Sequence, residues 1–206
     1  MRLLKNKTTD EKTKKKVYEA AIDTAILIAK KDEGGLIIIG ETKFYDCHFP
    51  NFFERKKFNI LDTGMVEVLS KLGIVDGAIV LDADGRIRAY GARILKQETA
   101  KGFGTRHSAA KGISKENCLA ILASEQDKVV RIFKKGNKVM EINPHTKTVE
   151  KNVSKIVKLL TKSETAGLIA GAAAVPIIGI PGVIIFGGSY FVSKKILGMI
   201  KEIEFK

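Results

Sequence analysis

Residues 101–114 read KGFGTRHSAAKGIS. Two glycines flank a phenylalanine, and Thr-Arg-His-Ser then runs into alanines, which predicts a loop that leads into a helix over 105–114. Before this stretch, residues 76–95 predict two strands joined by an Asp-Gly turn, and after it the apolar run CLAILAS at 118–124 predicts a buried strand. A helix inserted between strands is typical of an α/β domain.

The alternation of helices and strands continues outward in both directions. Further helices are predicted over 16–31 and 64–73, a buried strand over 34–40, and a second hairpin over 128–142 with its turn at Gly136-Asn137. We therefore expect an α/β fold with a central mixed β-sheet and helices on both faces, followed by a Gly/Ala-rich hydrophobic helical segment. The expected divisions are a basic N-terminal segment at 1–16, the α/β domain at 17–150 and a hydrophobic tail at 151–206.

The basic excess of the chain lies in its two flanks. The 206 residues carry 36 Lys/Arg and 23 Asp/Glu, a formal net charge of +13. Residues 1–16 contribute +5 (seven minus two), residues 151–206 contribute +5 (eight minus three), and the middle contributes +3 (21 minus 18). A nucleic-acid-binding protein usually concentrates positive charge on its folded domain, so we do not expect nucleic acid as a partner. Basic flanks fit an anionic membrane surface, and they equally fit plain solubility.

Cysteine usage and the start of the chain favour a cytoplasmic catalytic or binding domain. Cys47 and Cys118 are far apart and match no metal-binding or redox spacing. Cys118 opens an apolar run, so it is expected to be a small buried residue. The basic N-terminal stretch has no apolar segment of the kind found in secretory signals.

The tail contains a long uncharged run. Residues 165–193 carry no charge, and these 29 residues exceed the roughly 20 that cross a bilayer. Two internal prolines allow a hairpin of two short helices as well as a single span, and the lysines on both sides favour the hairpin, with both ends in the cytosol. The alternative is a pair of helices packed on the α/β domain or on a second subunit. Membrane association through 165–193 is the preferred expectation.

The predicted loop and helix start at 101–114 have the chemistry of a phosphate-binding site. A helix N-terminus presents unpaired N–H groups and a partial positive charge. Gly104 lets the backbone approach a ligand closely, Thr105 can cap the helix, and Arg106 offers a fork of donors to phosphate oxygens. The chain contains no Walker A motif. A glycine-rich turn before an ordinary helix is the alternative explanation.

Two carboxylates lie at the ends of predicted strands. Asp76 comes just before a strand in GIVDGAIVL, and Glu125 comes just after CLAILAS. A carboxylate at a strand end can hold a metal ion or face a ligand, and ligands of α/β proteins collect at strand ends. The alternative explanation for Asp76 is an ordinary turn aspartate that caps the loop. The sequence alone does not show whether Asp76, Glu125 and the loop at 101–104 converge.

Three short motifs together resemble the diadenylate cyclase domain, the catalytic domain of the enzymes that make cyclic di-AMP. They are DGA at 76–78, GTRHSAA at 104–110 and SE at 124–125, and the resemblance covers roughly residues 17–145. It implies condensation of two ATP molecules into cyclic di-AMP with release of two pyrophosphates, in two active sites that face each other in a homodimer. It also implies Mg²⁺ or Mn²⁺ as the cofactor.

The resemblance implies a role for each residue of these motifs. Asp76 would bind the metal and help to activate the ribose 3′-hydroxyl, with Glu125 near the metal. Arg106 and His107 would complete the catalytic set by gripping the triphosphate. The nucleotide contacts that the resemblance implies are Gly77, Ala78, Ala92, Leu95, Gly104, Thr105, Ser108 and Ser124.

The chain departs from the family pattern at two positions. The family motif is usually R-H-R, whereas this chain has Ser108 in the third place, so one phosphate-facing arginine is missing and a lysine such as Lys101 is a candidate replacement. Some relatives stack a tyrosine on adenine where this chain has Ala92, and Tyr90 is expected to point to the same face of the strand and to replace it. These departures leave a nucleotide-sensing module without activity as the alternative to an active cyclase.

Overall fold

The computed structural model describes residues 10–47, 57–98, 104–165, 174–176 and 180–186. Its centre is a nine-stranded sheet with the strand order β2-β4-β3-β1-β5-β6-β7-β9-β8. β1 and β3 pair in parallel, and the other neighbouring strands pair antiparallel, so the sheet is mixed as predicted. The strands are β1 (Gly35–Ile39), β2 (Tyr45–Asp46), β3 (Ala78–Leu81), β4 (Ile87–Ile94), β5 (Leu119–Ser124), β6 (Val129–Lys134), β7 (Asn137–Ile142), β8 (Ala174–Pro176) and β9 (Val183–Phe186).

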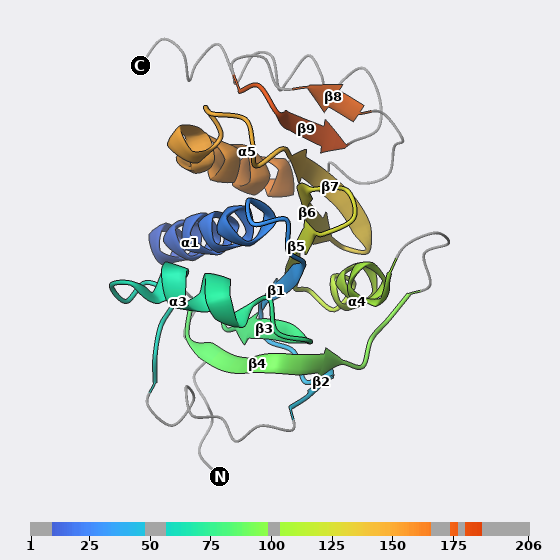
Figure 1. Ribbon diagram of the computed structural model, residues 1–206. Coiled ribbons are helices and arrows are strands. Elements are labelled where there is room, and N and C mark those ends of the chain that lie inside the picture. The colour runs from blue at the N-terminus through green and yellow to red at the C-terminus, as the bar shows by residue number, and fades with distance from the viewer. Residues whose placement is uncertain (1–9, 48–56, 99–103, 166–173, 177–179, 187–206) are drawn as a thin grey trace.

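Helices cover both faces of the sheet, as predicted (Figure 1). One face forms a hydrophobic core with α1 (Glu11–Ala29), α3 (Met65–Leu72) and α5 (Val153–Thr165), and the short 3₁₀ helix Glu150–Asn152 leads into α5. The other face forms a smaller core with α4 (Thr105–Ile113). The N-terminus of α4 therefore lies on the less covered side of the sheet.

The central strand β1 contributes to both cores because its side chains alternate. Ile37 and Ile39 pack on the α1 side, whereas Leu36 and Ile38 pack on the α4 side, and each is at most 3% exposed. A strand buried on both faces reads as a continuous β-branched run, which is the pattern at 34–40. Cys118, just before β5, is buried as predicted.

The second hairpin turns one residue earlier than predicted. β6 ends at Lys134 and β7 begins at Asn137, so the turn is Lys135-Gly136 rather than Gly136-Asn137. Both turn residues have positive φ, 50° for Lys135 and 77° for Gly136. Two successive positive φ values are characteristic of a type I′ turn, whose twist matches that of the flanking strands.

The tail differs from the predicted pair of helices wherever the structure describes it beyond α5. β9 pairs antiparallel with β7, and Ile185 lies opposite Met140. β8 pairs in turn with β9, so two segments of the uncharged run form strands of the main sheet. α5 shares the core with α1, so the core continues beyond residue 150.

Neither flank is described completely. Among the helices within the described ranges, none has both the length and the apolar character that crossing a bilayer demands. The predicted membrane hairpin falls largely on 166–173, 177–179 and 187–193, which lie outside the described residues, so it stays a prediction. Residues 1–9 of the basic N-terminal segment are also outside them, and α1 begins at Glu11.

Asp23 lines a cavity of about 500 Å³ between α1 and α3. Burial, followed by the charges of Glu19 and Glu150, raises the pKa of Asp23 from 3.8 to about 6. Since the folded pKa exceeds the unfolded one, Asp23 favours folding at low pH, and this contribution is lost as the pH rises through 6. We expect Asp23→Asn to raise the free energy of unfolding by about 1 kcal/mol at pH 8, after allowance for solvent screening, and by less at pH 5. Urea denaturation at both pH values measures this, and equal gains would contradict it.

Candidate functional site

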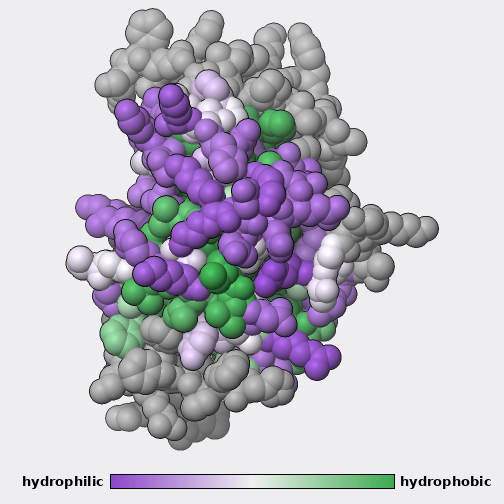
Figure 2. Space-filling model, viewed as in Figure 1, coloured by the Kyte–Doolittle hydropathy of each residue, from purple (hydrophilic) through white to green (hydrophobic). Residues whose placement is uncertain are grey.

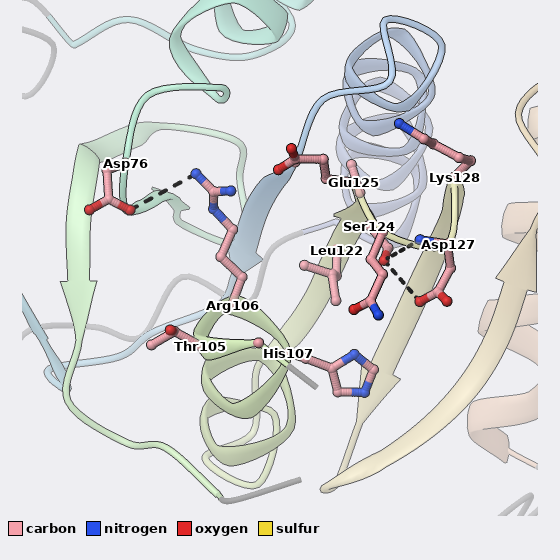
Figure 3. Close-up of a pocket in the computed structure, with 13 residues that line it drawn as sticks. Asp76, Thr105, Arg106, His107, Leu122, Ser124, Glu125, Asp127 and Lys128 are labelled. Carbon is pink, nitrogen blue, oxygen red and sulfur yellow. Dashed lines mark hydrogen bonds and ion pairs between the residues drawn. The ribbon is translucent and has the colours of Figure 1, made fainter. Parts of the chain in front are cut away.

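A cavity of about 440 Å³ lies at one edge of the sheet, beside the N-terminus of α4 (Figure 3). Its lining comes from segments far apart in the sequence, namely Gly34, Asp76, residues 104–107 and residues 122–128. The topology explains why they meet. β1 and β3 run parallel and β5 runs antiparallel to β1, so the residues before β1 and β3 and the residues after β5 lie at the same edge.

Asp76 and Arg106 approach each other at this cavity. Arg106 Nη2 lies 3.9 Å from Asp76 Oδ1. The N–H of Gly77 donates to the same Asp76 oxygen at 3.0 Å, and the Asp76 side chain is fully exposed to solvent. The carboxylate before β3 and the arginine at the start of α4 therefore share one cavity, with Glu125 on its lining as well.

Gly34 makes room for the arginine. In Figure 3 the Arg106 guanidinium lies between Asp76 and Glu125. A Cβ atom on Gly34 would stand 2.7 Å from Arg106 Nη1 and 3.4 Å from Glu125 Cβ, so only glycine leaves this space open. Arg106 Nε is buried and has no hydrogen-bond partner among the described residues, so the side chain keeps donor capacity for a ligand. The sequence motifs did not point to Gly34, whose only signal was the glycine pair before β1.

The N-terminus of α4 opens toward the cavity. Gly104 is the N-cap and Thr105 is the first helical residue, and neither supplies a side-chain cap, so the predicted capping role of Thr105 is wrong. Gly104 has an ordinary extended backbone with φ −73°, and a Cβ atom there would meet nothing within 4 Å. Because residue 104 has no side chain, the space in front of the first N–H groups of the helix stays open, and these groups stabilise an anion.

His107 lines the cavity as an uncharged residue at neutral pH. Its ring packs edge-to-face on Phe133 with 5.0 Å between the ring centroids. Burial, followed by the positive charges of Arg131 and Lys138, lowers the pKa of His107 to about 4. His107 can therefore give a ligand a neutral hydrogen bond, and Arg106 is the charged member of the Thr-Arg-His motif.

The low pKa of His107 predicts a pH-dependent stability. Because the folded pKa of about 4 lies below the unfolded value of 6.5, the contribution is complete above pH 6.5 and is lost as the pH falls toward 4. As the pH falls from 6.5 toward 4, we expect the free energy of unfolding to decrease less for His107→Gln than for the wild type. Urea denaturation at several pH values measures this difference. Comparing the two proteins removes the effect of Asp23, which titrates with the opposite sign. Parallel curves for both proteins would contradict the prediction.

The far wall of the cavity is built around a buried arginine. The Ser124 hydroxyl donates to Asp127 Oδ2 at 3.1 Å, and the Asp127 N–H donates back to Ser124 Oγ at 3.3 Å. Arg131 Nη1 lies 2.6 Å from the same Asp127 oxygen, and this hydrogen bond lowers the pKa of Asp127. Arg131 also pairs with Glu141 at 3.1 Å. The motifs missed Asp127, although an arginine inside the apolar strand β6 signalled an acidic partner.

Five of the expected nucleotide contacts do not line this cavity. They are Gly77, Ala78, Ala92, Leu95 and Ser108. Ala78 and Ala92 are buried opposite each other in neighbouring strands, whereas Leu95 is 55% exposed. The Ser108 hydroxyl lies 3.5 Å from the Gly104 carbonyl, one turn earlier in the same helix, rather than at the cavity. The candidate replacement Lys101 falls outside the described residues.

Tyr90 lies on the opposite face of the sheet from Ala92, so the expectation that both share a face is wrong. Tyr90 packs against the α1 core, whereas Ala89 and Ala92 both belong to the α4 core. The pairing of β3 with β4 shifts register here, and Gly91 has φ 61°. Such a β-bulge inserts one residue and reverses the alternation of side chains beyond it.

The acidic side chains of the cavity are the candidates for holding a divalent metal. Among the described residues, no group of three or more His, Cys, Asp or Glu side chains is placed to bind a metal. Asp76 nevertheless offers an exposed carboxylate, and Mg²⁺ is commonly held by one or two carboxylates plus substrate phosphates. Glu125 lies on the other side of the Arg106 guanidinium in Figure 3. Asp76 therefore fits the role of a metal ligand better than Glu125.

Comparisons with known proteins agree with the motifs. A family model described as "DAC: DisA bacterial checkpoint controller nucleotide-binding" matches residues 20–138. The chain is 32% identical over 158 residues to a diadenylate cyclase of Haloferax volcanii, which covers 69% of this chain and 56% of that protein. It is 30% identical over 150 residues to a diadenylate cyclase of Methanocaldococcus jannaschii, covering 66% and 48% respectively. The chain thus spans about half the length of these curated relatives.

A crystal structure of a double mutant of DacA from Staphylococcus aureus resembles the chain with a TM-score of 0.49 at 20% identity, covering 73% of this chain and 97% of that one. The family match spans the strands and the helix that build the cavity, and it includes Asp76, the motif at 104–107 and Glu125. The chain therefore belongs to the DAC family, the nucleotide-binding domain of diadenylate cyclases.

Proposed function

We propose that this chain is a diadenylate cyclase that joins two ATP molecules into cyclic di-AMP and releases two pyrophosphates. The observation that carries the proposal is the 3.9 Å approach of Arg106 to Asp76 in a cavity at the N-terminus of α4. A cation, a set of backbone N–H groups and a carboxylate in one cavity suit a triphosphate and the hydroxyl that attacks it. The relatives named diadenylate cyclase support the same activity.

The triphosphate binds at the start of α4 in this proposal. The first N–H groups of the helix and the Arg106 guanidinium bind its oxygens and stabilise their negative charge. His107 adds a hydrogen bond without a charge, because its pKa of about 4 keeps it neutral. Ser124, whose hydroxyl hydrogen is donated to Asp127, forms part of the opposite wall. Catalysis then depends on positioning and on charge neutralisation rather than on a covalent intermediate.

The chemical step is an in-line displacement at the α-phosphorus. The 3′-oxygen of one ATP forms a bond to the α-phosphorus of the other, the bridging bond to the β-phosphate breaks, and pyrophosphate leaves as the hydroxyl proton is released. A second identical step closes the ring. Asp76 orients the attacking hydroxyl. Asp76 would hold a divalent metal, Mg²⁺ or Mn²⁺, together with the phosphates, and this metal would supply Lewis acidity to the attacking hydroxyl.

The proposed reaction requires two copies of the chain, because each cavity holds one ATP. Asp76 projects fully into solvent, where a nucleotide on a facing copy can reach it. Ile74 and Val75, the two residues before Asp76, are 38% and 45% exposed. Figure 2 shows hydrophobic residues gathered in the region of α3 among hydrophilic ones. A facing copy would remove such apolar side chains from water, which favours association.

The product assay tests this proposal directly. The purified chain is incubated with ATP and Mn²⁺, and cyclic di-AMP and pyrophosphate are quantified by mass spectrometry and an enzymatic assay. We expect two pyrophosphates for each cyclic di-AMP, with a rate that depends on the square of protein concentration when the dimer is dilute. A chain that binds ATP and forms no product would contradict the proposal.

A nucleotide-sensing module is the second candidate. It is favoured by Ser108, which stands in place of the usual second arginine and does not line the cavity. Such a module binds ATP or cyclic di-AMP at the same residues without turnover. Isothermal titration with each nucleotide, run beside the product assay, separates the two functions.

A further inference from the structure

Two charged residues near the cavity have a left-handed backbone. Asp32, which precedes β1, has φ 62°, and Lys128, which follows β5, has φ 55°. This conformation is disfavoured for residues with a side chain and is most readily adopted by glycine. Strained positions of this kind concentrate at functional sites. Because Lys135 in the β6–β7 turn shares this conformation, a role for Lys128 depends on its position in the lining of the cavity.

Lys128 and Arg106 approach the same short segment of chain. Lys128 lines the cavity, and its Nζ atom lies 3.2 Å from the Asp32 carbonyl and 3.4 Å from the Asp32 carboxylate. Gly34, two residues later, lies against Arg106, whose Nη1 atom is 2.7 Å from the position of a Gly34 Cβ. In Figure 3 the Lys128 side chain extends toward the side of the cavity where Glu125 lies. The segment 32–34 thus connects two cationic groups of one cavity.

A more highly charged anion can replace Asp32 as the partner of Lys128. Both side chains are well exposed, 44% for Lys128 and 59% for Asp32. Exposed pairs of this kind contribute little to stability because water and salt screen them. A triphosphate carries several negative charges and forms charge-assisted hydrogen bonds with an ammonium group. The flexible lysine side chain can turn from Asp32 to a phosphate without movement of the backbone.

Ser108, which follows Arg106 and His107, carries no charge, and its hydroxyl stays near the Gly104 carbonyl. We propose that Lys128 binds the β- and γ-phosphates of ATP and so supplies the second cation of this site. The inference rests on the proposed function, because it assigns a ligand contact within the same nucleotide site. Asp32 holds the lysine beside the cavity until the phosphates arrive.

Lys128→Gly is the decisive variant, and Lys135→Gly is its matched control. Lys135 is also an exposed lysine with a left-handed backbone, φ 50°, but it lies in the β6–β7 turn and does not line the cavity. Each substitution removes one positive charge and relieves the same backbone strain. We expect Lys128→Gly to raise the KM for ATP about tenfold, the loss of one charge-assisted contact, without lowering the melting temperature. Lys135→Gly is expected to leave KM unchanged, and Lys128→Arg to keep it within about threefold.

Equilibrium titration separates this inference from the proposed function. Lys128→Gly is expected to weaken the binding of ATP while leaving the binding of AMP unchanged, since AMP lacks the β- and γ-phosphates. Weaker ATP binding in a chain that makes no cyclic di-AMP would sustain the role of Lys128 and overturn only the proposed cyclase activity. ATP binding equal to that of the wild type, or an equal loss for ATP and AMP, would overturn the role of Lys128.

Discussion

Asp76→Asn is expected to lower cyclic di-AMP formation by at least about 10³-fold while the protein stays folded. Asparagine keeps the oxygen that accepts the Gly77 N–H, and Asp76 is fully exposed, so no packing is lost. What disappears is the negative charge that, in the proposed mechanism, would orient the hydroxyl and hold a cation next to the phosphates. The free energy of unfolding is expected to change by less than about 0.5 kcal/mol, as for most surface substitutions.

Glu67→Gln is the matched control for the loss of one surface carboxylate. Glu67 is exposed on α3 and does not line the cavity at Asp76. Initial rates of product formation and urea denaturation curves are measured for both variants. We expect the control to turn over ATP like the wild type. Turnover within tenfold of the wild type in Asp76→Asn would remove this carboxylate from the mechanism.

The sheet was predictable where local patterns decide the structure. The β-branched run at 34–40 lies between glycines, and it forms the fully buried strand β1. The same pattern, a β-branched run between glycines, recurs in GVIIFG at 182–187, and β9 forms there. The absence of charge over 165–193 concealed this signal, because an uncharged run suits a membrane helix as well as a buried strand. Whether this run forms a strand or a helix depends on pairing with β7, and β7 lies too far away in the sequence for a local pattern to reveal it.

The two errors on β4 and on the hairpin turn have a different origin. Alternation placed Tyr90 and Ala92 on one face, but the bulge at Gly91 inserts a residue between them. Glycine signals such a bulge only when its positive φ is known, because glycine also occurs in regular strands. The turn at Lys135-Gly136 requires positive φ at a lysine, which turn chemistry does not favour.

The convergence of the site depends on strand order rather than on spacing. Asp76 and Glu125 meet because β3 and β5 both neighbour β1 and run in opposite directions. The motif residues were recognisable from their order along the chain, whereas Gly34 and Lys128 were not. Gly34 matters through its contact with Arg106, and Lys128 through its place in the lining of the cavity. Neither feature can be recognised from the sequence, because each depends on the folded structure.

Gly77→Ala is expected to destabilise the protein by about 3 kcal/mol and to disturb the site next to it. Gly77 has φ 101°, and a Cβ atom there would stand 2.4 Å from the carbonyl carbon of Gly91 and 2.7 Å from its oxygen. The obstacle is backbone of the neighbouring strand, so a rotamer change cannot relieve it. A loss of this size lowers the melting temperature by roughly 6–12 °C in a chain of this length.

Two further glycines separate the causes of this loss. Gly64 has φ 78° with nothing within 4 Å of a Cβ atom, so Gly64→Ala carries the conformational cost alone, about 1 kcal/mol. Gly104 has φ −73° and equally open surroundings, so Gly104→Ala is expected to cost less still. Urea denaturation ranks the three variants.

The activity of Gly77→Ala then tests whether Asp76 must be held in place. Even at a temperature where the variant is folded, the displaced backbone moves the neighbouring Asp76 carboxylate away from Arg106, and a shift of about 1 Å can lower the rate about 10²-fold. Gly64→Ala, which is strained but lies outside this cavity, is expected to keep its turnover. Loss of stability without loss of turnover in folded Gly77→Ala would show that the 3.9 Å approach of Asp76 to Arg106 is not needed for the reaction.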